Sequence, residues 1–297
     1  MTLVVAGITD VDEAQISIVA DTKITNSNDD RFTDRAYENP GQKIVLLDDD
    51  TVIGFAGDTP ETAIKRAAKL RGRSIEEVLE DLAAYIRETN EISSLISKSF
   101  VVATRIPKPR LWKIANGSIE DRTHIRRSWV GDRDAYRYFQ GLRPLLPSPP
   151  EAPEEVTLTF SMMTLVASND IPTVGGYMSR VSGNKNQPFR FHSDPIFVAP
   201  WLTEISVYRP EPGIVELREN LPPGGDPTEH VCINIPGQPP TVGALAHYIP
   251  EIGTAWLHTH DEPWLDAVKL RGRTVDQVIA EAAERYGQYL MKPHFCR

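Results

Sequence analysis

Cysteine is scarce in this 297-residue chain, which contains only Cys232 and Cys296. Two cysteines cannot build a disulfide framework, so the class of small disulfide-rich secreted proteins is excluded. Long apolar runs are also missing, since none reaches the ~18 residues that a membrane-spanning helix needs. Acidic residues follow Gly7 within a few positions, which is unlike a secretory signal peptide. We therefore expect a cytoplasmic protein with no membrane partner.

An excess of positive charge is absent as well. The chain has 32 Lys and Arg against 41 Asp and Glu, which gives a formal net charge of -9. A nucleic-acid surface needs clustered basic side chains, so no nucleic-acid partner is expected. The basic stretch at residues 122–127 is short and typical of a solvated strand edge. The apolar fraction of 40% is ordinary for a globular chain with a substantial core.

The first half of the chain alternates strands and helices in a definite order. Apolar runs at residues 3–8 and 15–20 predict a hairpin, and residues 43–47 and 52–55 predict a second one. Thr59 and Pro60 are typical of a helix start, and Ser74-Ile75-Glu76-Glu77 is a capping box that opens another helix. Strands are then expected at 100–104, 111–114 and 129–130, followed by a helix at 135–142. This order indicates an α+β sandwich.

The second half of the chain is harder to interpret. The tract 144–153 contains five prolines and is either a domain linker or a long loop. Residues 156–160 alternate like a strand, yet Val156, Phe160, Met163 and Ala167 share one helical face. Paired strands are expected at 177–181 and 189–192, further strands at 214–218 and 230–235, and a final capped helix near 274–290.

Thr2 is the first candidate for chemistry. A small residue after the initiator methionine permits methionine removal, which would leave a threonine with a free α-amine. The pKa of such an amine is about 7.7–8.0, so near neutral pH it can act as a general base on the adjacent hydroxyl. Taken alone, Thr2 indicates nothing more than an arbitrary second residue.

Five segments change the interpretation of Thr2. They are the strand end Val19-Ala20-Asp21-Thr22-Lys23, Lys43-Ile44, Gly54-Phe55-Ala56-Gly57-Asp58, Ser128-Trp129-Val130-Gly131-Asp132 and the stretch from Asp170 to Gly176. Together with Thr2 and in this order, they resemble the proteasome β-subunit family and its bacterial relatives over about residues 2–195. The resemblance implies the four-layer αββα sandwich of N-terminal-nucleophile hydrolases. It also makes residues 156–168 a helix and the proline tract a loop.

The resemblance implies roles for individual residues. Thr2 would supply the nucleophilic Oγ and the α-amine. Lys43 would lie beside that amine and lower its pKa, because two neighbouring positive charges disfavour each other. Asp21 would pair with Lys43, and Gly57 would offer its backbone N–H to the developing oxyanion. Asp170 would order the site around the N-terminus.

Substrate contacts and two departures complete the implied site. Thr25 would bind the substrate backbone, and Phe55 would line the first specificity pocket. The family usually has serine where Asp132 stands, so a carboxylate would replace a hydroxyl in proton transfer. The stretch before Gly175-Gly176 carries one extra residue, which leaves Thr173 or Val174 at the usual serine position. We take Thr173 as the candidate.

A separate motif, His258-Thr259-His260, indicates a weak metal-site candidate. Residues i and i+2 of a strand share a face, so the two imidazoles could bind one zinc ion. The pattern resembles the His-x-His core of JAMM metalloproteases, but the proline after the second histidine and the later Ser-x-x-Asp of that family are missing. A polar strand end is the alternative, and the leading hypothesis needs no metal and no cofactor.

The leading hypothesis is a threonine-type hydrolase that cleaves peptide bonds through an acyl-enzyme at Thr2. Its substrate would be a peptide or protein, and the chain would form a homo-oligomer, either a ring or stacked rings. Residues 1–199 would form the hydrolase domain, and residues 200–297 a smaller α/β extension of unknown role. Transpeptidation is a variant, since the start Met-Thr-Leu-Val and the extension resemble connectase-type ligases. The rival is a non-catalytic assembly subunit, because a second alignment puts Met1 at the nucleophile position.

Overall fold

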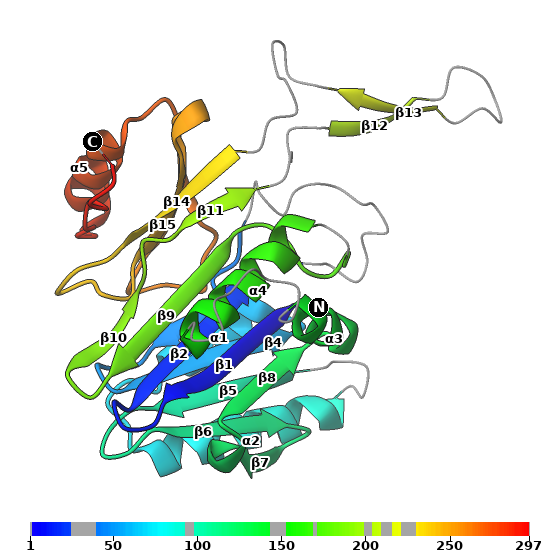
Figure 1. Ribbon diagram of the computed structural model, residues 1–297, viewed down its shortest axis with the longest axis vertical. Helices are drawn as coiled ribbons and strands as arrows, with labels where there is room; N and C mark the ends of the chain where they lie inside the picture. Colours follow the sequence, from blue (N-terminus) through cyan, green and yellow to red (C-terminus); the bar gives the residue numbers. More distant parts are fainter. Residues whose placement is uncertain are drawn as a thin grey trace.

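Two five-stranded antiparallel sheets form the body of the protein in the computed structural model (Figure 1). The structure describes residues 2–24, 40–92, 98–142, 153–168, 171–198, 204–208, 216–220 and 230–296. The first sheet has the order β10-β9-β2-β1-β8, made of β1 (Leu3–Asp10), β2 (Gln15–Asp21), β8 (Arg127–Gly131), β9 (Met178–Asn184) and β10 (Gln187–Phe191). The second has the order β3-β4-β5-β6-β7, made of β3 (Ile44–Leu46), β4 (Thr51–Gly57), β5 (Lys98–Thr104), β6 (Arg110–Ala115) and β7 (Ser118–Asp121).

The two sheets bury their facing sides against each other. Alternate apolar residues of β1 and β2, among them Val4 and Ile18, pack against residues such as Ile44 and Val101 of the second sheet. The two sheets are in close contact at Gly54. A Cβ on Gly54 would lie 2.6 Å from a methyl carbon of Val4, so a side chain at this position would force the sheets apart.

Helices cover the outer face of each sheet. The helices α1 (Pro60–Ala68) and α2 (Ile75–Ile92) pack on the second sheet, while α3 (Arg133–Leu142) and α4 (Glu154–Ser168) pack on the first. A short 3₁₀ turn, η1 (Thr123–Ile125), precedes β8. The chain therefore has a mixed α+β structure, as its sequence predicts.

Local signals at the helix starts are confirmed in part. In the predicted capping box, the Ser74 amide donates to Glu77 Oε2 (2.9 Å) and the Glu77 amide donates to Ser74 Oγ (3.3 Å). Thr59 stands at the N-cap of α1 as expected, but its side chain makes no capping hydrogen bond. The helical interpretation of residues 156–168 is confirmed, although the face shared by Val156 and Phe160 is the exposed one, at 38% and 44% exposure.

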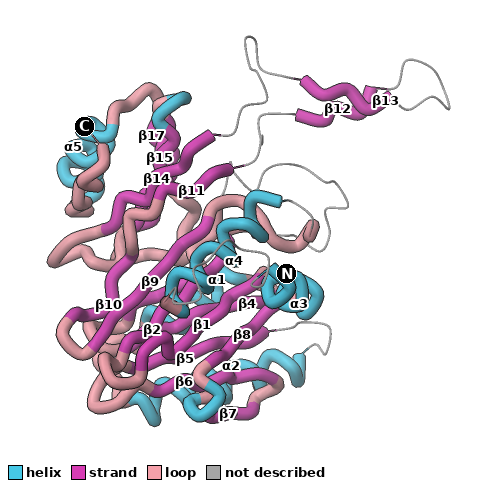
Figure 2. The backbone as a smooth tube through the Cα atoms, in the orientation of Figure 1, coloured by secondary structure: helices cyan, strands magenta, loops and turns pink. Residues whose placement is uncertain are grey.

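A third antiparallel sheet follows the sandwich (Figure 2). Its order is β11-β14-β15-β16-β17, made of β11 (Pro195–Val198), β14 (His230–Pro236), β15 (Leu245–Ile249), β16 (Thr254–His258) and β17 (Val268–Leu270). The 3₁₀ turn η3 (Pro250–Ile252) joins β15 to β16, and α5 (Val275–Tyr286) covers the outer face of the sheet. A separate hairpin pairs β12 (Glu204–Tyr208) with β13 (Glu216–Asn220), two residues later than the strand predicted at 214–218.

The third sheet begins before residue 199, because its edge strand β11 already pairs with β14. Its inner face contributes Cys232, Ile249 and Trp256 to the same buried cluster as α3 and α4. The division of the chain into a hydrolase domain and an extension at residue 199 stays a prediction.

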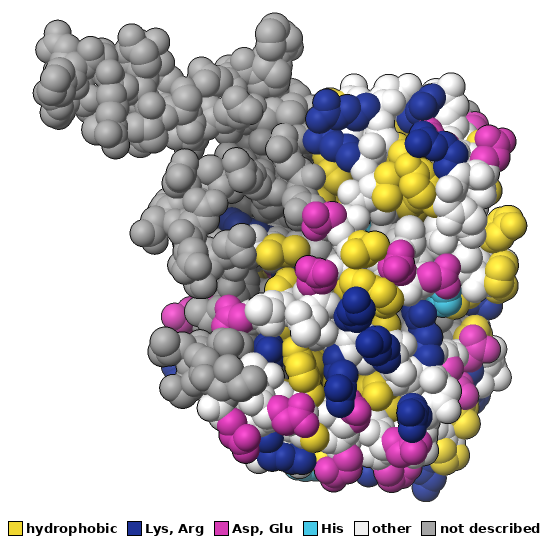
Figure 3. All heavy atoms as spheres, turned by 180° about the vertical axis from the view of Figure 1, so that it is seen from behind, with side chains coloured by type: hydrophobic (Ala, Val, Ile, Leu, Met, Phe, Trp, Pro, Cys, Tyr) yellow, Lys and Arg dark blue, Asp and Glu magenta, His cyan; other side chains and the backbone are white. Residues whose placement is uncertain are grey.

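The outer surface mixes charges of both signs. Figure 3 shows Lys and Arg side chains lying among Asp and Glu side chains over the rear face. Among the helices of the described ranges, none is both long enough and apolar enough to cross a bilayer.

Candidate active site

Thr2 lies directly before β1, the strand that runs between β2 and β8 in the first sheet. The residue is only 4% exposed. Its hydroxyl oxygen accepts a hydrogen bond from the ammonium group of Lys43 and donates one to Oδ1 of Asp21. The structure thus brings together the three residues that the sequence places first in the candidate site.

Lys43 and Asp21 form a buried ion pair. The Lys43 Nζ lies 3.1 Å from Asp21 Oδ1, and the two side chains are 3% and 0% exposed. The ammonium also donates to the carbonyl oxygen of Lys23 at 2.5 Å, so its three N–H groups have three acceptors. Burial lowers the pKa of Lys43, and the neighbouring Asp21 carboxylate offsets part of that effect.

The carboxylate of Asp21 is fixed by backbone donors from three segments. The amides of Leu3 (3.0 Å), Lys23 (3.2 Å) and Gly175 (3.3 Å) all donate to it. A buried charge pair is tolerated when further hydrogen bonds satisfy its lone pairs, and these amides meet that requirement. Asp21 therefore connects the start of β1, the end of β2 and the Gly175 segment.

Gly131 is a site residue that sequence reasoning did not single out. The Thr2 carbonyl oxygen accepts from the Asp132 amide at 2.8 Å, and Gly131 lies directly against it. A Cβ on Gly131 would lie 1.8 Å from that oxygen and 3.2 Å from the Cβ of Ala56. The φ of +112° is also strained for any other residue. Its only sequence signal was its place before Asp132 in a family-like segment.

Asp132 and Thr173 form a second group beside Thr2. Asp132 caps α3 by accepting from the amides of Asp134 (2.7 Å) and Ala135 (3.0 Å), and Thr173 Oγ1 donates to it at 2.7 Å. Burial opposes ionisation of Asp132, but these hydrogen bonds hold the pKa of the carboxyl below its usual value. In this arrangement Asp132 contacts Thr2 through its backbone amide, which donates to the Thr2 carbonyl oxygen.

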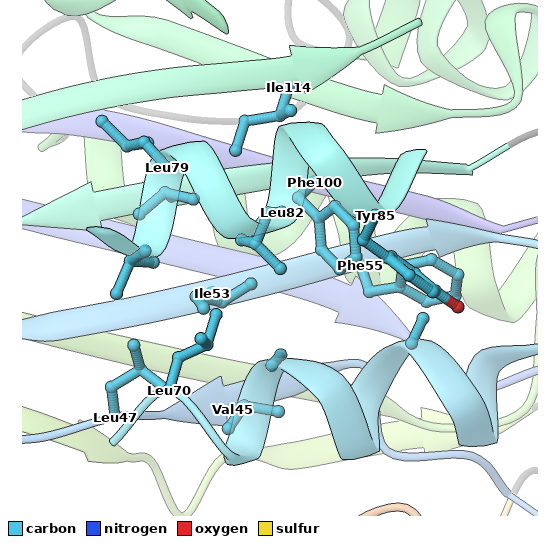
Figure 4. Packing of buried hydrophobic residues seen from close by; sticks show 14 of the residues in the cluster. Val45, Leu47, Ile53, Phe55, Leu70, Leu79, Leu82, Tyr85, Phe100 and Ile114 are labelled. Carbon is cyan, nitrogen blue, oxygen red and sulfur yellow. The ribbon is translucent and has the colours of Figure 1, made fainter. Parts of the chain in front are cut away.

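The remaining predicted residues lie in different surroundings. Gly57 ends β4 with a φ of +138°, next to Ala56. Phe55 is 1% exposed and packs beneath α1 and α2, with its ring centroid 5.2 Å from that of Phe100 (Figure 4). Thr25 and Asp170 fall outside the described residues. The roles of all four stay predictions.

The two candidate metal-binding histidines have separate surroundings. His258 is 1% exposed, and its ring meets that of His247 edge-on at 5.6 Å between centroids. His260 Nδ1 accepts from the amide of Gly243 at 3.0 Å. Within the ranges that the structure covers, no group of three or more His, Cys, Asp or Glu side chains could hold a metal ion.

No protein-family model and no curated protein matches the chain. Among solved structures, it is similar to the Gly-1 mutant of Anbu from Hyphomicrobium sp. strain MC1, with 16% identity and a TM-score of 0.47 over 65% of this chain and 86% of that one. It is also similar to the eukaryotic HslV from Trypanosoma brucei, with 14% identity and a TM-score of 0.45 over 61% of this chain and 98% of that one. The resemblance to proteasome-like proteins is confirmed as a structural similarity. Neither similarity assigns a role to any residue.

Proposed function

We propose that this protein is an N-terminal-nucleophile hydrolase that cleaves peptide bonds through Thr2 after removal of Met1. One observation carries the proposal: the Thr2 hydroxyl is buried between the ammonium of Lys43 and the carboxylate of Asp21. A threonine placed at random at the start of a strand has no need of a buried charge pair aimed at its hydroxyl. The cost of burying that pair indicates that the pair has a function.

The proposed reaction begins at the hydroxyl. The Thr2 oxygen attacks the carbonyl carbon of the scissile amide while its proton passes to the free α-amine of the same residue. The tetrahedral intermediate collapses when the C–N bond breaks and the leaving nitrogen takes up that proton. A threonyl ester remains. Water then attacks the ester and gives a proton to the α-amine. The acyl C–Oγ bond breaks, Oγ takes up that proton, and the acid and the free enzyme are released.

The surrounding groups would favour each of these steps. The Lys43 ammonium donates to the attacking oxygen, so negative charge that develops there is stabilised. The same positive charge keeps the α-amine neutral and basic near pH 7. The backbone N–H of Gly57 would bind the oxyanion, an interaction that contributes about 10²–10³ in rate in other hydrolases.

Reaction with a peptide epoxyketone tests the proposal. This reagent has two electrophilic carbons, which capture Oγ and the amine of an N-terminal threonine together. We expect intact mass spectrometry to show loss of Met1 and addition of one inhibitor to the wild-type protein. Thr2→Ala should show no addition, and Thr9→Ala, at the far end of the same strand, should react like wild type.

The outcome separates the proposal from its rival. A chain that fully retains Met1 and takes up no inhibitor would be a non-catalytic assembly subunit. Addition of inhibitor to Thr2→Ala would place the nucleophile elsewhere and overturn the proposal. Peptide substrates, the ring assembly expected from the resemblance, and catalytic groups confined to residues 1–199 belong to the same proposal.

A further inference from the structure

We propose that Asn234 and His247, on the third sheet, are positioning residues for the site around Thr2. They contact Met178 and Tyr177, and the backbone of this segment is hydrogen-bonded to Asp21. The inference rests on the proposed function for its catalytic consequence. We call this support of the 175–178 backbone by Asn234 and His247 the bracing. It is a property of the folded chain and can be measured without activity.

The inner face of the third sheet carries polar side chains that are buried completely. Side chains alternate along β14, β15 and β16, and one set, including Ile233 and Leu257, packs against α5. The opposite set includes Asn234 (0% exposed), His247 (0%) and His258 (1%). Buried polar groups cost free energy unless they are hydrogen-bonded, so their partners indicate what they are for.

The partners of the first two lead to the neighbouring sheet. The Asn234 side-chain amide donates to the carbonyl oxygen of Met178 at 2.9 Å. Its Oδ1 is therefore left to accept, and it lies 2.7 Å from His247 Nδ1, which assigns the proton to that nitrogen. The ring of Tyr177 stacks on the His247 ring, with centroids 4.9 Å apart and planes 18° apart.

The Met178 carbonyl needs a donor from the third sheet because β10, its neighbour on that side, ends before reaching it. The Arg180 carbonyl accepts from the His192 amide at 3.0 Å, as the strand order β9-β10 requires. Carbonyls two residues apart point to the same side of a strand, so the Met178 carbonyl points beyond the last residue of β10. The chain has already turned away and enters β11 at Pro195. Asn234 supplies the missing donor.

From Tyr177 the contacts continue to the catalytic carboxylate. The Tyr177 amide donates to Thr22 Oγ1 at 2.7 Å, and the Thr22 amide donates to the Tyr177 carbonyl at 2.9 Å. Two residues before Tyr177, the Gly175 amide donates to Asp21 Oδ2. The Lys23 amide donates to the Gly175 carbonyl at 3.1 Å. Displacement of the 175–178 backbone would move the Asp21 carboxylate and, with it, Thr2 and Lys43.

The loop that follows β16 makes further contacts with the region of α1. The Arg71 guanidinium donates to the carbonyl oxygen of His260 at 2.8 Å, and Lys65 of α1 lies over the ring of Trp264. The helix α1 follows Gly57, the predicted oxyanion donor. Residues from 230 on therefore contact both the 177–178 backbone and the α1 region, and among the described residues they make no hydrogen bond to Thr2 itself.

The test compares substitutions on the two faces of the same sheet. Asn234→Leu keeps the approximate side-chain size and removes the donor to Met178. His247→Leu removes the donor to Asn234, whereas His247→Asn keeps an N–H near that position. The control is Leu257→Ala, which opens a cavity on the face toward α5. The two readouts are epoxyketone labelling kinetics, and hydrogen exchange of the Lys23 and Gly175 amides in the full-length protein.

We expect Asn234→Leu and His247→Leu to slow the maximal labelling rate by about 10-fold or more, because small displacements of reacting groups are costly. The apparent affinity for the reagent should change little. Exchange of the Lys23 and Gly175 amides should become faster, and His247→Asn should restore both readouts in large part. Leu257→Ala should lower the unfolding temperature and leave both readouts at wild-type values.

Failure of the bracing and failure of the function give different results. If the two amides exchange at wild-type rates in folded Asn234→Leu or His247→Leu, the bracing is overturned. If every variant and the wild type fail to label while the exchange pattern appears, the bracing stands and the proposed function falls. If Leu257→Ala disturbs the site as strongly as Asn234→Leu, the effect is general destabilisation and the positioning role is wrong.

Discussion

The hydroxyl oxygen of Thr2 accepts a hydrogen bond from the ammonium group of Lys43. The two residues are 41 positions apart in sequence, and Lys43 directly precedes β3 of the other sheet. Thr2 and Lys43 therefore come from different layers of the sandwich. Their contact depends on how the two sheets are packed.

Replacement of Lys43 by Met tests its electrostatic role. In the proposed mechanism the substitution removes a positive charge beside the α-amine, so the pKa of that amine should rise. The acid limb of kcat/KM against pH should then move to higher pH, and the maximal rate should fall. Lys69→Met, on the exposed surface of the chain, should leave the profile unchanged.

The same variant needs a check on folding. Asp21 loses its buried partner in Lys43→Met, so the free energy of unfolding should fall by about 3–5 kcal/mol. Circular dichroism at each pH shows where both the variant and the wild type are folded, and their rates are compared only at those pH values. A folded variant with a normal rate and an unshifted profile would remove Lys43 from the mechanism.

Gly131 should not tolerate a side chain. In Gly131→Ala the new Cβ would lie 1.8 Å from the Thr2 carbonyl oxygen, and the positive φ adds strain. We expect destabilisation by more than about 4 kcal/mol in urea unfolding, or no folding at all. The matched control is Gly141→Ala in α3, where a Cβ meets nothing within 4 Å. That change should stabilise the helix by about 0.5–1 kcal/mol.

Asp132 should act first as a helix cap. Asp132→Ala removes the acceptor for the first amides of α3 and should cost about 0.5–2 kcal/mol of unfolding free energy. Asp132→Ser keeps a capping oxygen and should cost less. Because the pKa of Asp132 is lowered in the folded state, its charged form adds stability above its ordinary pKa, and that stability is lost as the pH falls through the folded value. Equal stability of the Ala and Ser variants at pH 7 would rule out the cap.

His258 should make stability depend on pH. Burial lowers its pKa from 6.5 to about 4, and neither ring nitrogen has a hydrogen-bond partner among the described residues. Between these values the unfolded chain binds a proton that the folded chain does not. Stability should therefore fall as the pH drops from about 6.5 to 4, by on the order of 3 kcal/mol from this residue.

His258→Leu tests that dependence by chemical denaturation at pH 7.5 and pH 4.5. The variant should be about as stable as wild type at the higher pH, because it replaces an unpaired buried polar group by an apolar one. Its stability should fall less at the lower pH. His247 and His192, whose pKa values are also lowered by burial, should keep part of the effect. Exposed His124→Gln should behave like wild type, and an unchanged pH response in His258→Leu would contradict the assignment.

Local signals were sufficient to predict most of the sandwich. The hairpins at residues 3–21 and 44–57 follow from alternating apolar runs, and the helix at 75–92 follows from its capping box. Residues 156–160 alternate like a strand although a helical face was also present, and the resemblance decided for a helix over residues 156–168. Packing explains why that pattern misled. Its buried side includes Thr157 and Ser161, and apolar Phe160 is exposed.

Non-local contacts account for what could not be predicted. The strand β11 pairs with β14 across a long insertion, so no short-range pattern identifies the third sheet. Within the site, Thr2, Asp21 and Lys43 were found by their order and residue type. The Gly175 amide and the Thr2 carbonyl act through the backbone, which has no residue-specific signature. Asn234 was missed because a buried asparagine in a strand looks like any polar strand residue.

The early end of β10 has a structural consequence. Had that strand continued beyond His192 for two more residues, the amide of Asp194 would face the Met178 carbonyl and complete the ladder. Asn234 would then have no acceptor to meet. Because the chain crosses to β11 at residues 193–194, the Met178 carbonyl has no backbone donor from β10. The side-chain amide of Asn234, in the third sheet, donates to it instead. The length of β10 is therefore coupled to the packing of the third sheet against the first. An insertion or deletion near residue 193 would alter both together.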